Sequence, residues 1–449
     1  MLQKVVIVGA GPAGLLLAHY LLSRRKYHVE IYERRADLRL VNASQDRTFP
    51  ISLQERGRKA LREIPGLEEA IAAASVFCNG TKLHRKRGKA RKFSRAAPIL
   101  TIDRNRLVMI LLQHLTQTYP AEQLIIKFDC ACVQVDRKAK TVTMQPAQGE
   151  AFSLSYDRLV AADGAQSQIR DILVQNAGLQ CEQNHVPDAY KSVFLSRLNP
   201  ALGLELEPDK IHGWNGDNQT RMLMVPQPGD RLNGVLIFDA ERNLNLSTKE
   251  EVLTFFQENF PLFGQLMSEE EAEDFLKRPV GRVLTIRCDR FHDGDSVLLI
   301  GDAAHAVSPS IGQGCNASLE DVRVFERLLE QHEDDWSLAL PAFTQQRVPD
   351  AHALKELSDY SFPRTKALRI EFFLRLTLKK LLHRWFPQRV KPFVFDLLLD
   401  QDLSYSQVLS LSQDWINKVK RSAAGGSTKQ SNSISRSKRN RTREKLNEV

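Results

Sequence analysis

A glycine-rich turn directly after a short apolar run constrains this chain more than any other feature. Residues 5–8 are Val-Val-Ile-Val, a β-branched run typical of a buried parallel strand. Residues 9–14, Gly-Ala-Gly-Pro-Ala-Gly, fit the pattern GxGxxG, and the leucine-rich residues 15–22 favour a helix. In this arrangement the three glycines permit a tight turn, close approach of the backbone to a pyrophosphate, and close packing of helix on strand. The sequence therefore predicts a dinucleotide contact at Gly9, Gly11, Pro12, Ala13 and Gly14.

A second predicted strand, residues 28–33, extends this site. It ends at Glu33, which lies 19 positions after Gly14, where an acidic side chain can accept hydrogen bonds from ribose hydroxyls. The helix that starts after the glycines offers free N–H groups and a positive dipole end to phosphates. We expect contacts from Glu33 and the following Arg34, but this motif alone leaves NAD and FAD unresolved.

Two later segments favour FAD. Residues 163–170, Asp-Gly-Ala-Gln-Ser-Gln-Ile-Arg, follow a predicted strand, and residues 301–305, Gly-Asp-Ala-Ala-His, follow another. An aspartate at a strand end can hold a ribityl hydroxyl, and a glycine-rich turn that opens a helix places N–H groups and positive dipole at the pyrimidine edge of a flavin. The contacts predicted from these segments are Asp163, Asp302, Pro309, Gly312, Gly314, Cys315 and Asn316.

The three motifs, in this order, resemble those of the group A FAD-dependent monooxygenases, which have the para-hydroxybenzoate hydroxylase fold. The resemblance spans residues 4 to about 330. It implies an α/β fold with a Rossmann-like FAD-binding domain, an inserted antiparallel β-sheet substrate domain and C-terminal helices. Arg104, within Asp-Arg-Asn-Arg-Leu, resembles the arginine that this family sets against FAD. Arg47 is expected either to touch the cofactor or to form a surface ion pair.

A closer resemblance is to the kynurenine 3-monooxygenase family, carried by residues 47–61, 255–261 and 341–353 and extending to about residue 400. The departures fall on positions that hold the substrate in that family. The arginine for the substrate carboxylate aligns with Thr81, a tyrosine with Lys92 or Phe93, an asparagine with Ser361, another tyrosine with Val394, and a phenylalanine pair with Ser310 and Ile311. The resemblance therefore predicts the class of enzyme and not its substrate.

The resemblance implies that NADPH or NADH reduces FAD, that O2 reacts with the reduced ring, and that a flavin hydroperoxide hydroxylates an aromatic or other electron-rich small molecule. The cofactor carries this chemistry, so no catalytic triad or metal is required, and we name no catalytic base. His305 lies inside a flavin-binding turn, where we predict a packing role. Two alternatives remain from sequence: a flavin-dependent reductase or oxidase of the geranylgeranyl reductase type, and a noncatalytic FAD-containing interaction protein.

The length of 449 residues is too great for one compact core. Changes in composition predict a first part of the FAD-binding domain at 1–180 and a substrate-domain β-sheet at 181–285. They then predict the return of the FAD-binding domain at 286–340, a C-terminal helical region at 341–420 and a disordered basic tail at 421–449.

The net charge of +9 is concentrated at the C-terminus. From Lys418 onward there are ten basic and two acidic residues, a net charge of +8, so the rest of the chain is nearly neutral. Residues 372–386 form a basic amphipathic stretch, which either packs on the protein core or contacts a membrane surface. No apolar run approaches the ~20 residues that span a bilayer, so the expected location is cytoplasmic, with peripheral membrane contact as an option.

A second basic run occupies residues 82–95 and contains no acidic residue. Such runs are usually solvated loops, and the functional options are an acidic substrate, the phosphate of a nicotinamide cofactor, or a membrane. Sparse aromatic residues within the run do not favour nucleic-acid binding. The six cysteines are too scattered for a disulfide framework, and none forms a CxxC pair.

Overall fold

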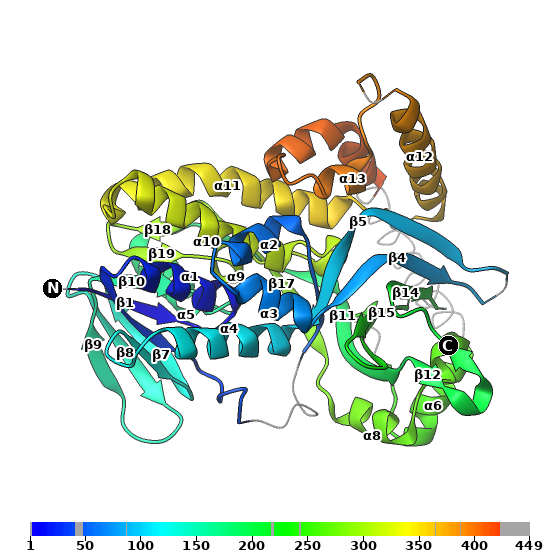
Figure 1. The fold of residues 1–449 in the computed structure, drawn as a ribbon, viewed down its shortest axis with the longest axis horizontal. Helices are drawn as coiled ribbons and strands as arrows, with labels where there is room; N and C mark the ends of the chain where they lie inside the picture. The colour runs from blue at the N-terminus through cyan, green and yellow to red at the C-terminus, as the bar shows by residue number, and fades with distance from the viewer. Residues whose placement is uncertain are drawn as a thin grey trace, which may run out of the picture. The chain divides into compact units, whose positions relative to one another are not determined.

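The computed structural model describes residues 2–40, 48–86, 88–216, 220–241, 244–363, 365–386 and 388–422 (Figure 1). The chain divides into two compact units. The first comprises residues 1–308 and 312–348, and the second comprises residues 309–311 and 349–449. The predictions for Arg47, Arg87 and the basic tail from residue 423 lie outside the described residues.

A six-stranded sheet forms the nucleotide-binding part of the first unit, in the order β18-β19-β10-β1-β2-β6. The strands are β1 (Gln3–Val8), β2 (Tyr27–Tyr32), β6 (Leu124–Lys127), β10 (Arg158–Ala161), β18 (His292–Asp293) and β19 (Val297–Leu299). Every pairing is parallel except that of β18 with β19. The α/β fold predicted from the sequence is confirmed.

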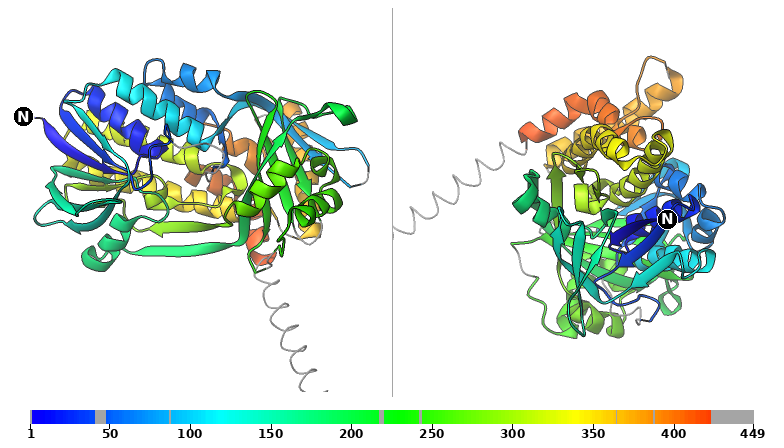
Figure 2. Two further views of the ribbon diagram at one scale, coloured as in Figure 1. Left: turned by 90° about the horizontal axis from the view of Figure 1, so that it is seen from below. Right: turned by 90° about the vertical axis from the view of Figure 1, so that its left-hand side faces the viewer.

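Helices pack against this sheet and against one another. They include α1 (Pro12–Ser23), α4 (Arg104–Thr118), α5 (Gln168–Ala177), α9 (Asp302–His305) and α10 (Gly314–Gln331). Figures 1 and 2 show α1 and α4 side by side, and α1 also contacts α10. Helix α1 is buried on nearly all sides because leucine and alanine occupy every face, which suits a helix enclosed between a sheet and other helices. Beside this core, β7 (Cys130–Asp136), β8 (Thr141–Pro146) and β9 (Phe152–Ser155) form a three-stranded antiparallel sheet.

An eight-stranded sheet forms the rest of the first unit, in the order β17-β11-β16-β15-β14-β4-β5-β3. Its strands are β3 (Pro50–Leu53), β4 (Val76–His84), β5 (Arg91–Asp103), β11 (Cys181–Ser196), β14 (Lys210–Asn215), β15 (Arg221–Gln227), β16 (Arg231–Asp239) and β17 (Gly281–Cys288). All pairings are antiparallel except that of β14 with β4. The sheet thus takes in residues 50–103, which the sequence pattern placed with the first domain, because partner strands from distant segments leave no local signal.

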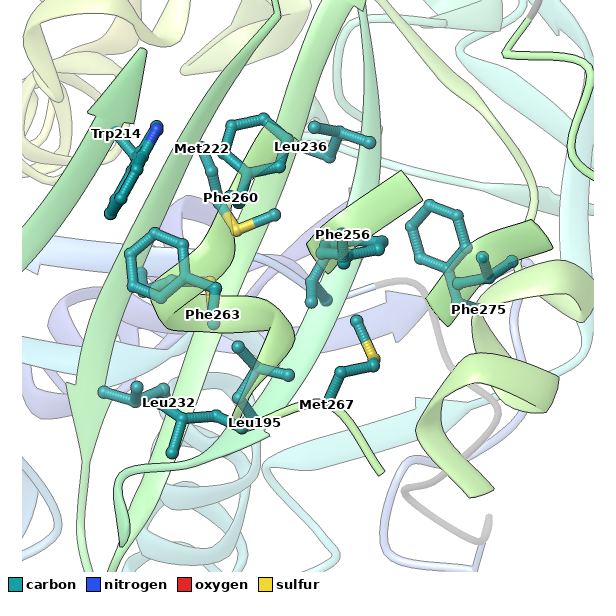
Figure 3. Close-up of a cluster of buried hydrophobic side chains, with 14 of the residues drawn as sticks. Leu195, Trp214, Met222, Leu232, Leu236, Phe256, Phe260, Phe263, Met267 and Phe275 are labelled. Atoms are coloured by element: carbon teal, nitrogen blue, oxygen red, sulfur yellow. The ribbon is translucent and has the colours of Figure 1, made fainter. Parts of the chain in front are cut away.

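One face of this sheet is covered by α6 (Lys249–Asn259), α7 (Pro261–Gly264) and α8 (Glu269–Lys277). Figure 3 shows phenylalanines of these helices packed against Trp214, Met222 and Leu236 of the strands. Because side chains alternate along a strand, Leu223 and Val225 point to the other face, where they join Cys78, Ile99 and Ile211. We call this second face the Cys78 face.

The basic run at 82–95 is not a loop. It occupies the end of β4, the turn of a hairpin and the start of β5. Lys82 and Lys92 both contact Glu207, at 2.5 and 2.9 Å. The prediction of a solvated loop is therefore wrong for the strand residues, because ion pairing to a carboxylate distant in sequence lets the lysines line a strand pair.

The second unit is helical. Helix α11 (Trp336–Tyr360) begins in the first unit and ends in the second, where α12 (Lys366–Trp385), α13 (Val394–Leu398) and a helix at 405–422 follow. Phe372 of α12 packs against Phe393 and Trp415, so one side of α12 is buried. Within the described parts of the chain, no helix is both long enough and apolar enough to cross a membrane.

The remaining elements are α2 (Glu55–Arg62), α3 (Leu67–Ala73), β12 (Leu198–Asn199), β13 (Leu204–Glu205) and the 3-10 helices η1 (Pro200–Leu202) and η2 (Pro309–Ile311).

Candidate functional site

The glycine turn between β1 and α1 leaves no room for side chains at two positions. Gly9 has φ +107°, and a Cβ there would lie 2.3 Å from the carbonyl oxygen of Ala162. A Cβ on Gly14 would lie 2.2 Å from the carbonyl oxygen of Gly9. These two glycines therefore hold the turn against β10 and the helix against the turn.

Gly11 is different, because the space beside it is open. It is the N-cap of α1, with Pro12 as the first helical residue, and the atom nearest to a Cβ there would be Arg104 Nη2, at 3.9 Å. The N–H groups of Ala13 and Gly14 lie in the first turn, where a helix provides no partners of its own. This position thus has the free donors and the clearance that a phosphate-binding turn requires.

Glu33 follows β2 and faces the glycine turn. Its Oε2 accepts a hydrogen bond from the Ala10 N–H at 2.8 Å, and its Oε1 accepts one from the Arg35 N–H at 3.0 Å. A carboxylate oxygen can accept two hydrogen bonds, so capacity remains for a hydroxyl ligand. The neighbouring Arg34 is exposed.

Arg104 brings the motifs together. It begins α4, whose N-cap Asp103 accepts hydrogen bonds from the first-turn N–H groups of Asn105 and Arg106. Its guanidinium interacts electrostatically with Glu33 of the first motif and with Asp302 and Cys315 of the third. Burial lowers the pKa of Arg104, yet a guanidinium stays protonated in proteins. The site therefore contains a positive charge among three segments that are far apart in sequence.

Asp163 has one carboxylate oxygen in use and one without a partner. Oδ2 accepts a hydrogen bond from the Gln168 N–H at 2.8 Å, whereas the buried Oδ1 has no hydrogen-bond partner among the described residues. Burial raises the pKa of Asp163, despite hydrogen bonds that lower it. A buried acceptor without a partner costs about 1–3 kcal/mol, which a ligand hydroxyl would offset.

Asp302 lies at the start of α9 and is exposed to solvent, but enough protein surrounds it that desolvation raises the pKa of its carboxyl. It has no hydrogen-bond partner among the residues that the structure describes. The preceding Gly301 packs closely on the first motif, because a Cβ there would lie 3.2 Å from that of Ala13. Asp302 is therefore held beside the glycine turn with its carboxylate available.

The turn before α10 contributes backbone groups. Gly312 has φ +66°, and Gly314 and Cys315 begin the 18-residue helix α10. Burial raises the pKa of the Cys315 thiol to about 12, so the thiol is neutral. The first-turn N–H groups of this long helix have no intrahelical partners and carry its positive dipole end.

Asn316 is occupied by the protein itself. Its Oδ1 accepts from the Gln54 N–H at 2.8 Å, and its Nδ2 donates to the carbonyl oxygens of Ser52 and Gly312 at 2.9 and 3.1 Å. The side chain of Asn316 therefore holds the turn before α10 in place, and its backbone N–H is the group that remains for a ligand. Pro309, the last of the predicted contacts, begins η2, which clusters with the second unit.

Two supporting groups escaped the sequence analysis. Arg170 Nη1 donates to the carbonyl oxygens of Ala165 and Ala303, at 3.0 and 3.3 Å, and so ties the Asp163 turn to α9. Gln54 accepts a 2.6 Å hydrogen bond from Gln313, beside α10. Arg170 belongs to the quoted motif, but nothing local to the sequence indicates which carbonyls it reaches.

His305 is buried and bonds to Asp321. Asp321 also accepts a hydrogen bond from Arg347 Nε at 2.7 Å and from the Gly301 N–H at 3.2 Å. Burial opposes protonation of His305, but the Asp321 carboxylate outweighs it and raises the pKa of His305. His305 therefore packs behind the turn, in the position that a structural role requires.

The Cys78 face carries two of the residues that depart from the family pattern, Thr81 and Phe93. Thr81 pairs with Ile211 on one side and Phe93 on the other, and paired residues point to the same face. Arg95, two residues after Phe93, is partly buried and has an Nε without a partner among the described residues. Cys78 pairs with Ile99, and Gly80 pairs with Ser94. Residues 95–98 of β5 therefore lie opposite the single residue Asn79 of β4, which makes this part of the strand pair a β-bulge.

Comparisons with known proteins show the family of the chain. Residues 3–353 match the family described as FAD binding domain. A kynurenine 3-monooxygenase of Sus scrofa is 28% identical over 93% of this chain and 88% of its own length, and one of Legionella pneumophila is 30% identical over 80% and 79%.

Solved structures show the same fold at lower identity. The tetrameric form of 2-methyl-3-hydroxypyridine-5-carboxylic acid oxygenase is 22% identical, with a TM-score of 0.67 over 80% of this chain and 91% of that one. A variant of HpxO from Klebsiella pneumoniae, complexed with FAD, is 19% identical, with a TM-score of 0.61 over 79% and 88%.

The residues fit FAD, since two helix N-termini, an Asp163 oxygen without a hydrogen-bond partner and the partly buried Arg104 converge on one place. The chain belongs to the FAD-binding domain family, whose profile covers most of its length. Within that family it is a FAD-dependent monooxygenase, an oxidoreductase that takes NAD(P)H and O2 as co-substrates. Of the described residues, no group of three or more His, Cys, Asp or Glu could hold a metal ion.

Proposed function

We propose that FAD binds where Arg104 meets the first and third motifs, with Asp163 of the second motif against Gly9. The main support is that Glu33, Asp302 and Cys315 all lie close enough to interact electrostatically with Arg104. Arg104 in turn lies beside Gly11, where no atom comes closer than 3.9 Å to the position of a Cβ. In this arrangement the N–H groups of Ala13 and Gly14 bind the pyrophosphate, Glu33 accepts from the ribose, and Asp302 accepts from a ribityl hydroxyl. Asp163, through its free Oδ1, accepts a further hydroxyl or N–H of the cofactor.

Bound FAD supplies the redox and oxygen chemistry, and the protein positions it. The N-terminal end of α10 places unpaired N–H groups and positive dipole at the edge where negative charge develops on reduction. Neutral Cys315 fills space beside that edge without adding charge. Arg104 and the nearby Arg35 offset the negative charges of Glu33 and Asp302, so the site would tolerate further negative charge on a bound cofactor.

The direct test is the visible spectrum of purified protein, before and after addition of FAD. We expect a flavin spectrum with one FAD per chain. Arg104→Gln should weaken FAD binding at least tenfold, whereas Arg106→Gln, an exposed neighbour on the same helix turn, should leave it unchanged. Colourless protein that FAD cannot reconstitute would refute the proposed site.

For the substrate, we propose an aromatic molecule with an anionic group that binds against the Cys78 face, with Arg95 as its partner. The relatives are named for kynurenine, which carries a carboxylate, but the resemblance aligns the family's carboxylate-binding arginine with Thr81 and a tyrosine with Lys92 or Phe93. Arg95 lies on the same face, and burial lowers its pKa with only the Cys78 thiol as an electrostatic partner. A desolvated guanidinium without an acid is strongly stabilised by an anion.

This substrate proposal is tested by pairing acids with their amides. We would measure NADPH oxidation and O2 consumption with kynurenine, 2-aminobenzoate and hydroxybenzoates, and with the corresponding amides. Arg95→Gln should raise KM for the active acid by ten- to a hundredfold and abolish the preference for acid over amide. Arg91→Gln, an exposed arginine on the same strand, is the matched control. Equal activity on acids and amides in the unchanged enzyme would refute an anionic substrate.

We also propose that α12 contacts an anionic membrane surface. Ile370, Leu374, Leu378, Leu381 and Trp385 recur at helical spacing on its outer side, and each is more than half exposed. Arg369, Arg375, Lys379 and Arg384 accompany this stripe along the helix, which gives it the basic character of interfacial helices. The opposite side of α12 is already occupied by the aromatic cluster around Phe372.

Flotation with phosphatidylserine-containing vesicles tests this contact. The intact protein should float, and Leu374→Ser together with Leu378→Ser should reduce the floating fraction several-fold without unfolding, because both side chains are exposed. Leu338→Ser, which changes an equally exposed leucine on α11, is the control. Equal flotation of all three proteins would contradict the proposal.

A further inference from the structure

Two cysteines that are far apart in sequence lie side by side in the eight-stranded sheet. Cys181 begins β11, Cys288 ends β17, and the two residues are directly paired in the antiparallel register. Their sulfur atoms are 3.2 Å apart, with the Cys288 thiol donating to Cys181 Sγ. Both residues are in the thiol form.

The backbone at this point suits a disulfide. The Asp289 N–H donates to the Gln180 carbonyl at 3.0 Å, so residues 180 and 289 form a hydrogen-bonded pair and residues 181 and 288 the adjoining non-hydrogen-bonded one. In such pairs the Cα atoms are ~4.5 Å apart and the side chains are closest, within the range of Cα separations that a disulfide spans. The bond can therefore form without a change in strand register.

The two thiols are not equivalent. Cys181 is partly exposed, while Cys288 is buried. The hydrogen bond from Cys288 lowers the pKa of Cys181, assisted by the positive charge of Arg170, and the same contact together with burial raises the pKa of Cys288. Cys181 thus has the access and the thiolate character of an attacking sulfur, and Cys288 is placed to resolve it.

We propose that Cys181 and Cys288 form a peroxide-oxidised dithiol site. The Cys181 thiolate attacks the O–O bond of hydrogen peroxide, which gives a sulfenic acid and hydroxide. The Cys288 sulfur then displaces hydroxide from the sulfenic acid, so that two thiols and one peroxide become one disulfide and two waters. The peroxide comes from the enzyme's own reactants when turnover is uncoupled, since NAD(P)H, a proton and O2 yield NAD(P)+ and hydrogen peroxide.

The position of the site gives the cross-link a structural consequence. It joins the two points where the chain enters and leaves the sheet segment between residues 181 and 288. Two residues before Cys288, the Ile286 N–H donates to the Ala306 carbonyl, just after the α9 segment that contains Asp302. Oxidation therefore stiffens the edge of the sheet that adjoins the flavin turn, and a closed loop of this length stabilises mainly by restricting the unfolded chain.

The experiment uses the FAD-loaded enzyme, reduced and then exposed to one equivalent of hydrogen peroxide. Thiol alkylation and peptide mapping without reductant should show a Cys181–Cys288 disulfide, and unfolding should shift upward by several degrees. Cys288→Ser should stop at a sulfenic acid that dimedone traps on Cys181, and Cys181→Ser should give no dimedone adduct on Cys288. Cys130→Ser, which removes a buried thiol of β7, should give the same Cys181–Cys288 disulfide as the unchanged enzyme.

Two results would overturn the proposal. One is full alkylation of all six cysteines after peroxide treatment, and the other is a disulfide that joins any other pair. Addition of NADPH without substrate should give the same disulfide, and catalase should prevent it; oxidation that catalase leaves intact would exclude released peroxide as the oxidant.

Discussion

The two large sheets of the first unit are built in opposite ways. The six-stranded sheet presents its ligand groups at strand ends, where glycine geometry and helix N-termini decide what binds. The eight-stranded sheet presents side chains on a face assembled from strands between residues 50 and 288. Backbone-defined sites leave a short contiguous signature in sequence, whereas a face built from side chains leaves none.

The largest effect should come from Gly9→Ala in the six-stranded sheet. Alanine there combines a left-handed φ with a Cβ placed 2.3 Å from the Ala162 carbonyl oxygen. Backbone strain of about 1–3 kcal/mol and overpacking of similar size give a loss of up to about 6 kcal/mol. We expect a protein without FAD that unfolds at lower denaturant concentration, measured by flavin absorbance and urea titration.

Gly11→Ala separates cofactor binding from stability. Its Cβ would have nothing closer than Arg104 Nη2 at 3.9 Å, so the apoprotein should unfold at an unchanged midpoint. The added methyl would nevertheless occupy the space into which we place the pyrophosphate, and the Kd for FAD should rise. Normal FAD binding by Gly11→Ala would contradict the placement of the pyrophosphate beside Gly11, and with it the view that backbone geometry defines this site.

A buried ion pair in each region gives the next largest effect. Asp321 is fully buried against His305 and Arg347, and Glu271 is buried against Arg278 at 2.5 Å. Asp321→Asn and Glu271→Gln should each cost about 3–5 kcal/mol, since the first removes the carboxylate that His305 and Arg347 share, although Arg347 keeps Glu320, and the second removes the carboxylate of Arg278. Only Asp321→Asn should also weaken FAD binding, because Asp321 holds the Gly301 N–H behind the flavin turn. Urea unfolding of the apoproteins and FAD titration together distinguish the two.

Much of the six-stranded sheet and of the FAD site at its strand ends was predictable from the sequence, whereas little of the eight-stranded sheet was. The strand, turn and helix at residues 3–23 follow from local pattern, as do the acidic strand ends at Asp163 and Asp302. The pairing of β4 with β14 and the meeting of Cys181 with Cys288 depend on contacts across more than a hundred residues, and the bulge at Arg95 depends on the register of β4 against β5. Roles of individual side chains were also hidden, as Asn316 illustrates by binding the protein itself.

A fourth prediction concerns the pH dependence of stability in the eight-stranded sheet. His84 bonds to His212 at 2.9 Å and stacks on Trp214, and burial, with His212, lowers the pKa of His84 to about 4. The unfolded chain binds this proton near pH 6.5, so the stabilisation is complete above pH 6.5 and declines as the pH falls toward 4. Between pH 7 and pH 5 the loss from His84 is about 2 kcal/mol.

His84→Phe keeps an aromatic ring beside Trp214 but cannot titrate. The difference in unfolding free energy between pH 7 and pH 5, measured by urea titration, should therefore be smaller for His84→Phe than for the unchanged protein. His305, beside the FAD site, should give a pH dependence of stability with the opposite sign. Because its pKa is raised in the fold, its contribution to stability is complete below pH 6.5 and is lost at higher pH. An identical pH dependence for the two proteins would show that His84 is already protonated or solvated in the fold.

The smallest effect should come from Lys92, which tests whether the basic hairpin acts as a unit. Lys92 is 63% exposed and shares Glu207 with Lys82, whose side chain is 22% exposed. Although burial raises it, both lysines together lower the pKa of Glu207 to about 2, so the carboxylate stays paired if one lysine is lost. Lys92→Gln should therefore change the unfolding free energy by less than ~0.5 kcal/mol and leave KM unchanged, because an exposed pair contributes little.

Arg95→Gln, three residues along the same strand, should change KM and not stability. If Lys92→Gln raised KM as much as Arg95→Gln, substrate recognition would rest on the summed charge of the hairpin instead of one desolvated guanidinium.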